Sequence, residues 1–492
     1  MHTIVPVDRE SPFSVDELFF SATDRKGIIR ASNEVFVRVS KHPHEELDGA
    51  PHNIIRHPDM PRAVFRVMWT ELLAGRPIAA YVKNMAADGS YYWVTASVVP
   101  VPGGFLSVRL KPTTEHRAAV ERIYAAVRRH ELEVENGDLR RRKQSIEAGV
   151  EKLLELLAEA GFETYDDFAN RILPAEVAGR EEQLGCGVRD RVEPLPPGAD
   201  LHLVAVFEGC ARAYEFLDGL GANLERYAAL NQSLESKADF VVELAEAIRL
   251  FSMNAQLAAS RLGDDGAALG AVAQLMRARS DTTGPIIAEL REQILRAVDG
   301  LGGIGFRIAA AKLQAEMLLQ FASELMHGGV DAHTRSELQI LAGSLDDEIE
   351  RLLDTVSQID ERLRGVSARA GDLERELSRL RALEVNGRVE SARTADSASV
   401  QQLFVSIGEQ VAAAQAELSG FDAVQAVTSQ RDAVAETRVR GDVGALQAHV
   451  AAALKGSTVT AAAPAAPEAD APPDGPEDAA AGREADADAA AV

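Results

Sequence analysis

The side chains best suited to chemistry in this 492-residue chain lie close together within residues 51–61. Arg56, His57 and Asp59 place a guanidinium, an imidazole and a carboxylate in one short segment. Together these groups can donate hydrogen bonds to a polar ligand and accept them from it. The same residues could instead form a polar turn that caps the following helix, and His52 or His57 could bind a haem iron. The residue types alone leave all three uses open.

The elements around this segment predict a small α+β domain over residues 14–113. Residues 91–100 are aromatic and β-branched and follow an Asp-Gly turn signal, which is typical of the second strand of a hairpin. Residues 105–110 predict a further strand, and the apolar residues within 61–75 recur at helical spacing. Short strands and short helices followed by an antiparallel ribbon are typical of a sensor domain.

The order of residues in this domain resembles the PAS domain of aerotaxis receptors. The resemblance rests on Pro-His-Asn-Ile-Ile-Arg-His-Pro-Asp-Met-Pro at 51–61 and on the motifs Gly-Arg-Pro, Val-Lys-Asn, Asp-Gly and Tyr-Trp-Val that follow it. That family binds FAD without a covalent bond and reports the redox state of the cell. The resemblance therefore implies a PAS fold and FAD as the cofactor, and haem bound through His52 or His57 stays the less favoured alternative that the residue types allow. It implies cofactor-binding roles for Asn33, Arg56, His57, Asp59, Trp69 and Asn84.

These residue types suit a flavin, which needs donors to its ring oxygens and nitrogens and a cation near its pyrophosphate. Neither Cys186 nor Cys210 lies in the domain, so a light-driven cysteinyl–flavin adduct is excluded. Trp69, like Trp93, also suits a place in the hydrophobic core. One departure is Ile78, which stands where aerotaxis receptors have a tryptophan and would alter flavin packing or redox poise. A PAS domain that holds no cofactor is the alternative.

From residue 114 onward, apolar residues follow a helical period. Residues 114–200 predict a helical connector that ends in a linker broken by glycines and prolines. The third of the helices that follow carries a heptad seam from Leu338 to Leu380, which is typical of a coiled coil. We expect four helices of similar length, at 201–262, 265–327, 331–394 and 398–454.

These patterns predict an α+β PAS domain followed by an all-α rod, built as a long antiparallel coiled coil or four-helix bundle. The C-terminal tail is rich in Ala, Pro, Asp and Glu and cannot bury a core, so we expect it to be disordered. The expected order is an N-terminal arm at 1–13, the PAS domain at 14–113, the connector at 114–200, a first hairpin at 201–330, a second, fainter hairpin at 331–456 and the tail at 457–492.

Residues 250–266 resemble the hairpin tip of methyl-accepting chemotaxis proteins, in which an Asn, a later Arg and a pair of glycines precede a Val-Ala return. Rods of that family are four-helix bundles made by two hairpins from two chains, and here both hairpins would lie in one chain. The signalling-tip residues that the resemblance implies are Asn254, Arg261, Gly263, Gly266 and, in a fainter second copy, Asn386 and Arg393.

Glycines gather on both sides of the first tip and predict a hinge across the hairpin. Local fraying of the helices is the alternative. The expected hinge residues are Gly219 and Gly221 before the tip, and Gly300, Gly302 and Gly303 after it.

Charge and motifs exclude several classes of function. A net charge of −24 argues against a general nucleic-acid binder and against docking on an anionic membrane. No apolar run is long enough for a membrane span, and the first residues lack the features of a signal peptide. Two cysteines suit a reducing cytosol, and no phosphate-binding loop, metalloprotease motif or nucleophile elbow occurs. We therefore expect a cytoplasmic sensor that is not an enzyme.

The predicted function is a signal transducer that senses redox state or oxygen through FAD. Its expected partner is a chemotaxis-type kinase, adaptor or other signalling protein at the helical tips, and the PAS domain or rod could also self-associate. The alternative is a cofactor-free scaffold, in which a PAS domain and a coiled coil only assemble partners.

Overall fold

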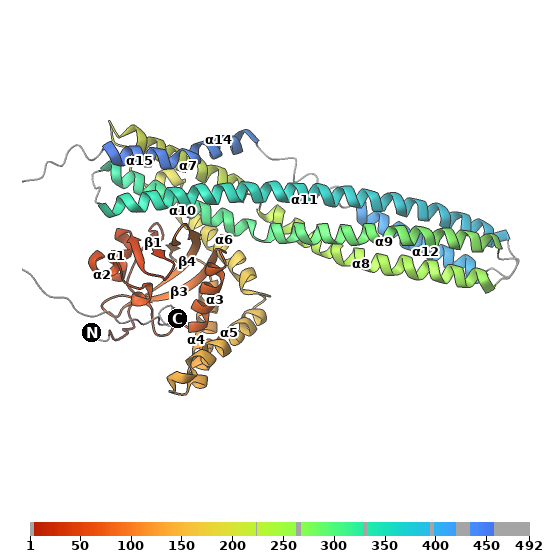
Figure 1. The fold of residues 1–492 in the computed structure, drawn as a ribbon, viewed down its shortest axis with the longest axis horizontal. Helices are drawn as coiled ribbons and strands as arrows, with labels where there is room; N and C mark the ends of the chain where they lie inside the picture. Colours follow the sequence, from red (N-terminus) through yellow and green to blue (C-terminus); the bar gives the residue numbers. More distant parts are fainter. Residues whose placement is uncertain are drawn as a thin grey trace, which may run out of the picture. The chain divides into compact units, whose positions relative to one another are not determined.

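The computed structural model describes residues 4–222, 224–261, 267–327, 332–393, 398–419 and 433–456 (Figure 1). The chain forms two compact units. The first takes its described residues from 1–219, 306–350 and 435–492, and the second takes them from 220–305 and 351–434. The expected tail at 457–492 and two expected tip residues, Gly263 and Gly266, lie outside the described residues.

The first unit begins with a five-stranded antiparallel sheet in the order β2-β1-β5-β4-β3. Its strands are β1 (Phe19–Asp24), β2 (Ile29–Ser32), β3 (Ile78–Met85), β4 (Tyr91–Val101) and β5 (Gly104–Leu110). Strands β3 and β4 form the hairpin that the aromatic, β-branched segment predicted. The segments between β2 and β3 are the helices α1 (Glu34–Ser40), α2 (His44–Leu47), η1 (His52–Ile55) and α3 (Arg62–Leu73).

Helices of the connector follow the sheet. The sequence predicted a helical connector from residue 114, and the structure has three α-helices there. The last of them ends where Gly185 adopts the left-handed conformation (φ 60°). Residues 192–200 form no helix or strand, as expected for a linker. The elements are α4 (His116–Glu135), η2 (Leu139–Arg141), α5 (Arg142–Glu159), α6 (Tyr165–Leu184) and η3 (Val188–Arg191).

Of the four long helices that we expected, only the third is a single helix. The extents of the others were wrong, because the first divides after Gly221, the second divides at Gly303 and the fourth divides into shorter helices. Glycine costs roughly 1 kcal/mol relative to alanine inside a helix, which favours breaks at these positions. The helices are α7 (Leu201–Gly221), α8 (Leu224–Arg261), α9 (Ala267–Gly302), α10 (Ile304–His327), α11 (Ala332–Arg393), α12 (Ala398–Ser419), α14 (Ala433–Gly444) and α15 (Leu446–Gly456).

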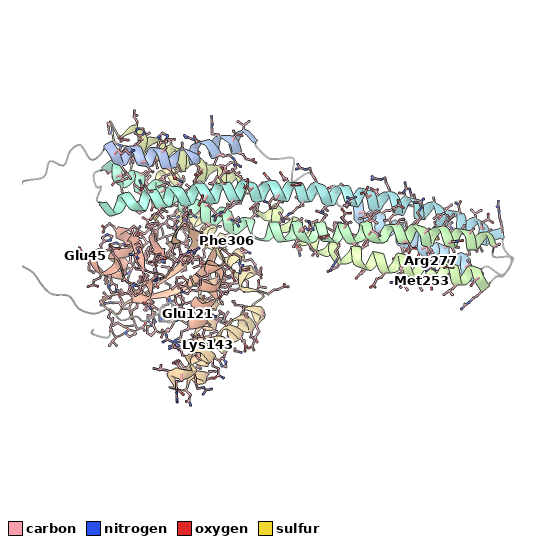
Figure 2. The ribbon with its side chains drawn as sticks, viewed as in Figure 1. Glu45, Glu121, Lys143, Met253, Arg277 and Phe306 are labelled. Carbon is pink, nitrogen blue, oxygen red and sulfur yellow. The ribbon has the colours of Figure 1, made fainter. Side chains whose placement is uncertain are left out.

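The second unit is an antiparallel four-helix bundle made by one chain, from α8, α9, α12 and most of α11. Figure 2 shows the side chains along these helices, with Met253 of α8 and Arg277 of α9 labelled. Polar contacts join each helix to the next around the bundle. They are Arg277 to Gln256 (3.0 Å), Arg369 to Glu289 (3.0 Å), Arg381 to Gln415 (3.1 Å) and Lys237 to the carbonyl of Glu417 (2.7 Å). Every apolar residue of the predicted heptad seam, from Leu338 to Leu380, is buried. The coiled-coil prediction for α11 is confirmed.

Helices α6 and α10 cover one face of the PAS sheet, and α3 lies against the other. On the covered face, Tyr165 of α6 donates a hydrogen bond to the carbonyl of Ala79 (3.4 Å). The ring of Phe20 on β1 packs edge-on against Phe321 of α10, with 5.8 Å between the ring centroids. Because both faces of the central strands are covered, their residues are buried almost without alternation. Among the residues that the structure describes, no helix is both long and apolar enough to cross a membrane.

Candidate functional site

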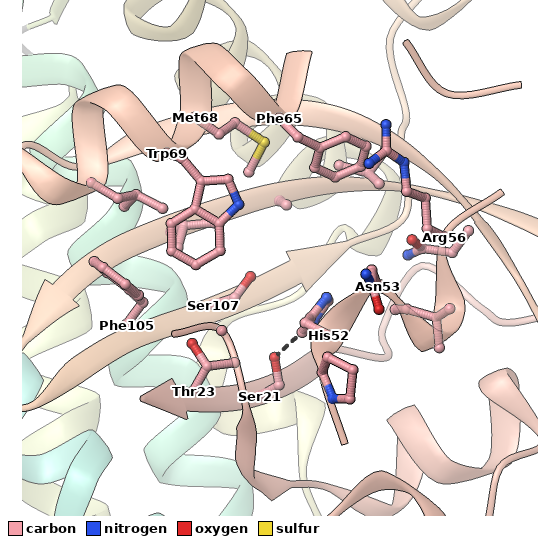
Figure 3. Close-up of a pocket in the computed structure, with 18 of the residues that line it drawn as sticks. Ser21, Thr23, His52, Asn53, Arg56, Phe65, Met68, Trp69, Phe105 and Ser107 are labelled. Atoms are coloured by element: carbon pink, nitrogen blue, oxygen red, sulfur yellow. Dashed lines mark hydrogen bonds between the residues drawn. The ribbon is translucent and has the colours of Figure 1, made fainter. Parts of the chain in front are cut away.

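A cavity lies between the inner face of the PAS sheet and helix α3 (Figure 3). It contains about 930 Å³ of space between atoms, part of which is open to solvent. Helix α3 supplies an apolar wall of Phe65, Met68, Trp69 and Leu72. Apolar walls with a few placed polar groups are typical of sites for small organic ligands and cofactors.

The alternation of strand residues decides which side chains face this cavity. On β1, Ser21 and Thr23 line the cavity, whereas Phe20, which precedes Ser21, packs against Phe321 of α10 on the outer face. On β5, Ser107 and Arg109 line it together with Phe105. The sequence analysis did not single out Arg109. The available signal was an arginine within the otherwise apolar strand at 105–110, in phase with Ser107.

Arg109 is a buried positive charge at the base of the cavity, with 4% of its surface exposed. It donates to the Oγ of Ser21 (3.0 Å) and to Nε2 of His52 (2.6 Å). Within the described part of the chain, no carboxylate pairs with it. Burial lowers the pKa of Arg109 to about 10, so the guanidinium stays charged at neutral pH. A buried cation without an anion is costly, and a ligand with an electron-rich or negative edge would stabilise it.

His52 accepts from Arg109 because its own ring is neutral. Burial, followed by the positive charge of Arg109, lowers the pKa of His52 to about 3. The ring also stacks on Phe36 of α1 with a centroid separation of 6.1 Å, which holds it in place. Since the Nε2 lone pair of His52 is used by Arg109, this arrangement does not offer that nitrogen to a haem iron.

Two further polar groups of the cavity lack partners. Nδ2 of Asn84 and Oγ of Ser107 are buried and have no hydrogen-bond partner among the described residues. Leaving a buried polar group unpaired costs about 1–3 kcal/mol. Both residues line the cavity, so a ligand with hydrogen-bonding atoms at its edge could satisfy them. Together with Arg109, they place hydrogen-bonding groups along one wall of the cavity.

Of the six residues expected to bind a cofactor, Arg56, Trp69 and Asn84 line the cavity. The guanidinium of Arg56 lies over the ring of Phe65, 4.2 Å from its centroid, at the side of the cavity opposite Phe105 (Figure 3). Trp69 packs edge-on against Phe105 at 5.4 Å, so it serves both the core and the cavity wall. The structure therefore brings these three expected residues together in one site.

The other three expected residues do not line the cavity. Asn33 caps helix α1, accepting from the backbone N–H of Phe36 (3.3 Å) and of Phe20 (3.0 Å). His57 accepts from the backbone N–H of Asp59 (3.1 Å), and Asp59 pairs with Lys83 (2.7 Å). His57 and Asp59 thus form a polar turn, although they do not cap the next helix.

A carboxylate from the connector caps helix α3 instead. Glu131 of α4 accepts from the backbone N–H of Arg62 (3.1 Å) and of Ala63 (2.8 Å), the first two residues of α3. Glu131 is fully buried. The position of α3, and with it one wall of the cavity, therefore depends on α4. Ile78, the departure from the family pattern, is buried on β3 and does not line the cavity.

A buried ion pair connects the PAS domain to α10. Arg180 of α6 donates to both carboxylate oxygens of Glu316 at 2.8 Å, and also to the carbonyls of Val15 (2.7 Å) and Asp16 (2.9 Å). Arg191 donates to the same carboxylate (2.8 Å). Only 1% of each side chain of the Arg180–Glu316 pair is exposed. The segment that leads into β1, helix α6 and helix α10 are thus joined at one point.

The expected tip residues are exposed where the structure describes them. Asn254 and Arg261 lie in the last turns of α8, and Asn386 and Arg393 lie in the last turns of α11. The first pair lies before the gap at 262–266 in the described residues, and the second before the gap at 394–397. Both pairs therefore lie at the same kind of position, at the C-terminal end of a long helix.

The expected hinge glycines lie at helix ends near the boundaries between the two units, which fall after residues 219 and 305. An added Cβ at Gly300 would lie 3.0 Å from Ile359 of α11, so this glycine permits close helix packing. An added Cβ at Gly219, Gly302 or Gly303 would have no atom within 4 Å. Close packing of glycines across the hairpin is therefore not seen at these positions, and fraying remains an alternative for them.

Comparison with known proteins agrees with the sensor-domain geometry. Residues 29–105 match the family model for the PAS fold. The chain is 41% identical over 124 residues to the aerotaxis receptor of Escherichia coli (strain K12), and the match covers 24% of each protein. The chain therefore spans about a quarter of the length of this curated relative. Residues 29–105 form a PAS domain, and a 124-residue part of the chain is similar to part of an aerotaxis receptor.

Proposed function

We propose that this chain senses redox state or oxygen through FAD held in the PAS cavity, and signals through its helices to a chemotaxis-type partner. The observation that carries the proposal is Arg109, a buried guanidinium without a carboxylate, beside the unpartnered groups of Asn84 and Ser107. The similarity of the N-terminal region to an aerotaxis receptor supports the same conclusion.

Each part of the cavity has a role in this proposal. Trp69 and Phe65 would pack against the faces or edges of a planar ring, while Asn84, Ser107 and Arg109 would hydrogen-bond its polar edge. His52, which also lines the cavity, accepts a hydrogen bond from Arg109 and holds its guanidinium in place. A bound flavin would supply reversible uptake of electrons and protons. The Arg109 guanidinium would then shift in position when the negative charge beside it changes.

Strand β1 offers a short path from the cavity to the helices. Ser21 accepts from Arg109 on the inner face, and the adjacent Phe20 packs against Phe321 of α10 on the outer face. A shift of Arg109 would therefore displace β1 and change its packing on α10. The ion pair between Glu316 of α10 and Arg180 of α6 would keep these two helices in contact during such a shift. The exposed ends of α8 and α11 are the proposed partner-binding surfaces.

The absorbance spectrum of the purified protein tests the central claim. We expect a visible flavin spectrum in the protein as isolated, or after its apoprotein is incubated with FAD. Arg109→Gln should lower flavin affinity at least tenfold, because a charge-assisted hydrogen bond at a buried site contributes about 1.5–3 kcal/mol. Arg140→Gln, which changes an arginine whose side chain is 91% exposed and pairs with Asp138 outside the cavity, is the control and should leave flavin binding unchanged.

A protein that stays colourless after incubation with FAD would refute the flavin proposal. That outcome would favour the cofactor-free scaffold. Full occupancy in the Arg109→Gln variant would leave the sensor proposal standing but would remove Arg109 from the site.

A further inference from the structure

Two histidines from distant parts of the chain meet at the surface of the first unit. His202 lies in the first turn of α7, and His449 lies in the first turn of α15, 247 residues later. Their Nδ1 atoms are 3.2 Å apart. The ring centroids are 5.5 Å apart, and the ring planes are inclined by 42°. Neither histidine lines the PAS cavity, so the pair is a separate feature of the molecule.

A packed pair of helices holds the two rings in this position. Helix α7 lies beside α14 and α15 (Figure 1), and Arg212 of α7 pairs with Asp442 of α14 at 2.8 Å. A Cβ added at Gly209 would lie only 3.1 Å from Leu446, so α7 and the start of α15 approach closely. These contacts run antiparallel along the two segments and place the two histidines opposite each other. Side chains on rigid helices need little further ordering to bind one ligand together.

The separation of the two nitrogens suits a shared metal ion better than a hydrogen bond between the rings. A distance of 3.2 Å is at the long end of the range for N–H donors, and such a bond requires that one Nδ1 carries the proton. Zinc binds imidazole nitrogens at about 2.0–2.1 Å in tetrahedral geometry, so two of its nitrogen ligands lie about 3.1–3.4 Å apart. The observed distance falls within this range.

The surroundings of the pair decide what kind of metal site it can make. The contact is exposed, so an ion can enter from solvent. Among the residues that the structure describes, no group of three or more His, Cys, Asp and Glu side chains could hold a metal ion. Two imidazoles and two waters would therefore complete the tetrahedron. Imidazole ligands suit zinc, whereas magnesium and calcium prefer oxygen ligands.

We propose that His202 and His449 form a zinc site that clamps α7 to α15. The ion would join the helix that follows the linker at 192–200 to the last helix that the structure describes. Since the two histidines meet only in the folded chain, zinc stabilises the packing of α15 against α7. With two protein ligands, occupancy of the site follows the zinc concentration. The site goes beyond the proposed flavin sensor and does not depend on it.

Isothermal titration calorimetry of the full chain with zinc chloride measures the affinity and the stoichiometry. We expect one zinc ion per chain at this site. His202→Gln and His449→Gln should each weaken zinc binding at least about tenfold, because changing even residues that only orient a metal ligand costs about 10–100-fold. Without zinc, both variants should unfold at nearly the same temperature as the unaltered protein, since the pair is exposed.

Hydrogen exchange locates the effect of the metal. Zinc should slow amide exchange in α15 and in the first turns of α7, and this slowing should vanish in either glutamine variant. His44→Gln is the matched control, because His44 is a partly exposed histidine of the same unit that pairs with the carboxylate of Glu34 (3.1 Å). This variant should bind zinc and protect α15 as the unaltered protein does.

Four results would overturn the zinc clamp. The first is an unchanged zinc affinity after both histidines are replaced, which would assign the ion to other groups. The second is a loss of affinity in only one of the two variants, which would show an adventitious ion on a single histidine only. The third is zinc binding that leaves exchange in α7 and α15 unchanged, and the fourth is no zinc binding at all. Because zinc binding is measured without flavin, each of these results leaves the flavin proposal intact.

Discussion

The buried pair between Arg180 and Glu316 gives the sharpest test of how the PAS domain is attached to α10. We consider the substitution Glu316→Gln, which preserves the shape of the side chain and removes its charge. The Glu316 carboxylate accepts three hydrogen bonds at 2.8 Å, two from Arg180 and one from Arg191. The side chains of these arginines are 1% and 4% exposed. The substitution would leave two buried guanidiniums without their shared anion.

The size of the effect follows from this burial. Removing one partner of a buried ion pair typically destabilises a protein by about 3–5 kcal/mol, because the remaining charge is desolvated and unpaired. The carbonyls of Val15 and Asp16 still accept from Arg180 and offset only part of this loss. We therefore expect Glu316→Gln to lower the free energy of unfolding of the first unit by about 3–5 kcal/mol.

Urea denaturation followed by tryptophan fluorescence measures this change. The chain has two tryptophans, Trp69 and Trp93, and both lie in the PAS domain, so the signal reports on the first unit. Glu208→Gln is the control, because Glu208 pairs with Arg189 at a side-chain exposure near one third on both sides. An exposed pair contributes at most about 1 kcal/mol. If Glu316→Gln destabilised the protein no more than Glu208→Gln does, the buried joint between α6 and α10 would be refuted.

Two further predictions concern the PAS domain itself. His52 has a folded-state pKa of about 3, below the unfolded value of about 6.5, so the unfolded state binds the proton first as the pH falls. The stability that neutral His52 contributes is therefore complete above about pH 6.5. The free energy of unfolding should decrease by about 2 kcal/mol on going from pH 6.5 to pH 5. His52→Gln should remove this pH dependence from urea titrations across that range. Gly104→Ala should destabilise the domain by roughly 2 kcal/mol or more, since an added Cβ would lie 1.8 Å from the backbone oxygen of Thr23. Gly103→Ala is the control, because an added Cβ there would meet no atom within 4 Å and only the positive φ (87°) opposes it. Thermal unfolding should therefore show a smaller loss of stability for Gly103→Ala than for Gly104→Ala. Equal losses of stability would contradict the steric argument.

Much of the fold could be predicted from local sequence patterns. The aromatic and β-branched residues along 91–100, which follow an Asp-Gly turn signal, predicted β4, and the heptad from Leu338 to Leu380 predicted α11. Both signals depend only on residues that are close together in the chain. Helix ends were harder to predict, since the breaks after Gly221 and at Gly303 interrupt patterns that continue on both sides. Apolar periodicity alone does not show at which glycine a helix ends.

The candidate site was partly predictable for a similar reason. Arg56, Trp69 and Asn84 were found because they belong to a recognisable signature, and they do line the cavity. His57 and Asp59 belong to the same signature, yet their side chains face a local turn and Lys83. Neighbours in sequence can therefore point to different surroundings, and a motif does not specify which of its members reach a ligand.

The sequence by itself determined the PAS signature, the aromatic and β-branched strand segments and the coiled-coil seam, because each depends on residues near one another in the chain. Only the tertiary structure decided that Arg109 meets His52, that Glu131 caps α3 and that Glu316 pairs with Arg180. These contacts join segments far apart in sequence, and their energies depend on burial and on exact side-chain geometry. No local pattern encodes a partner that folding alone brings within hydrogen-bonding distance.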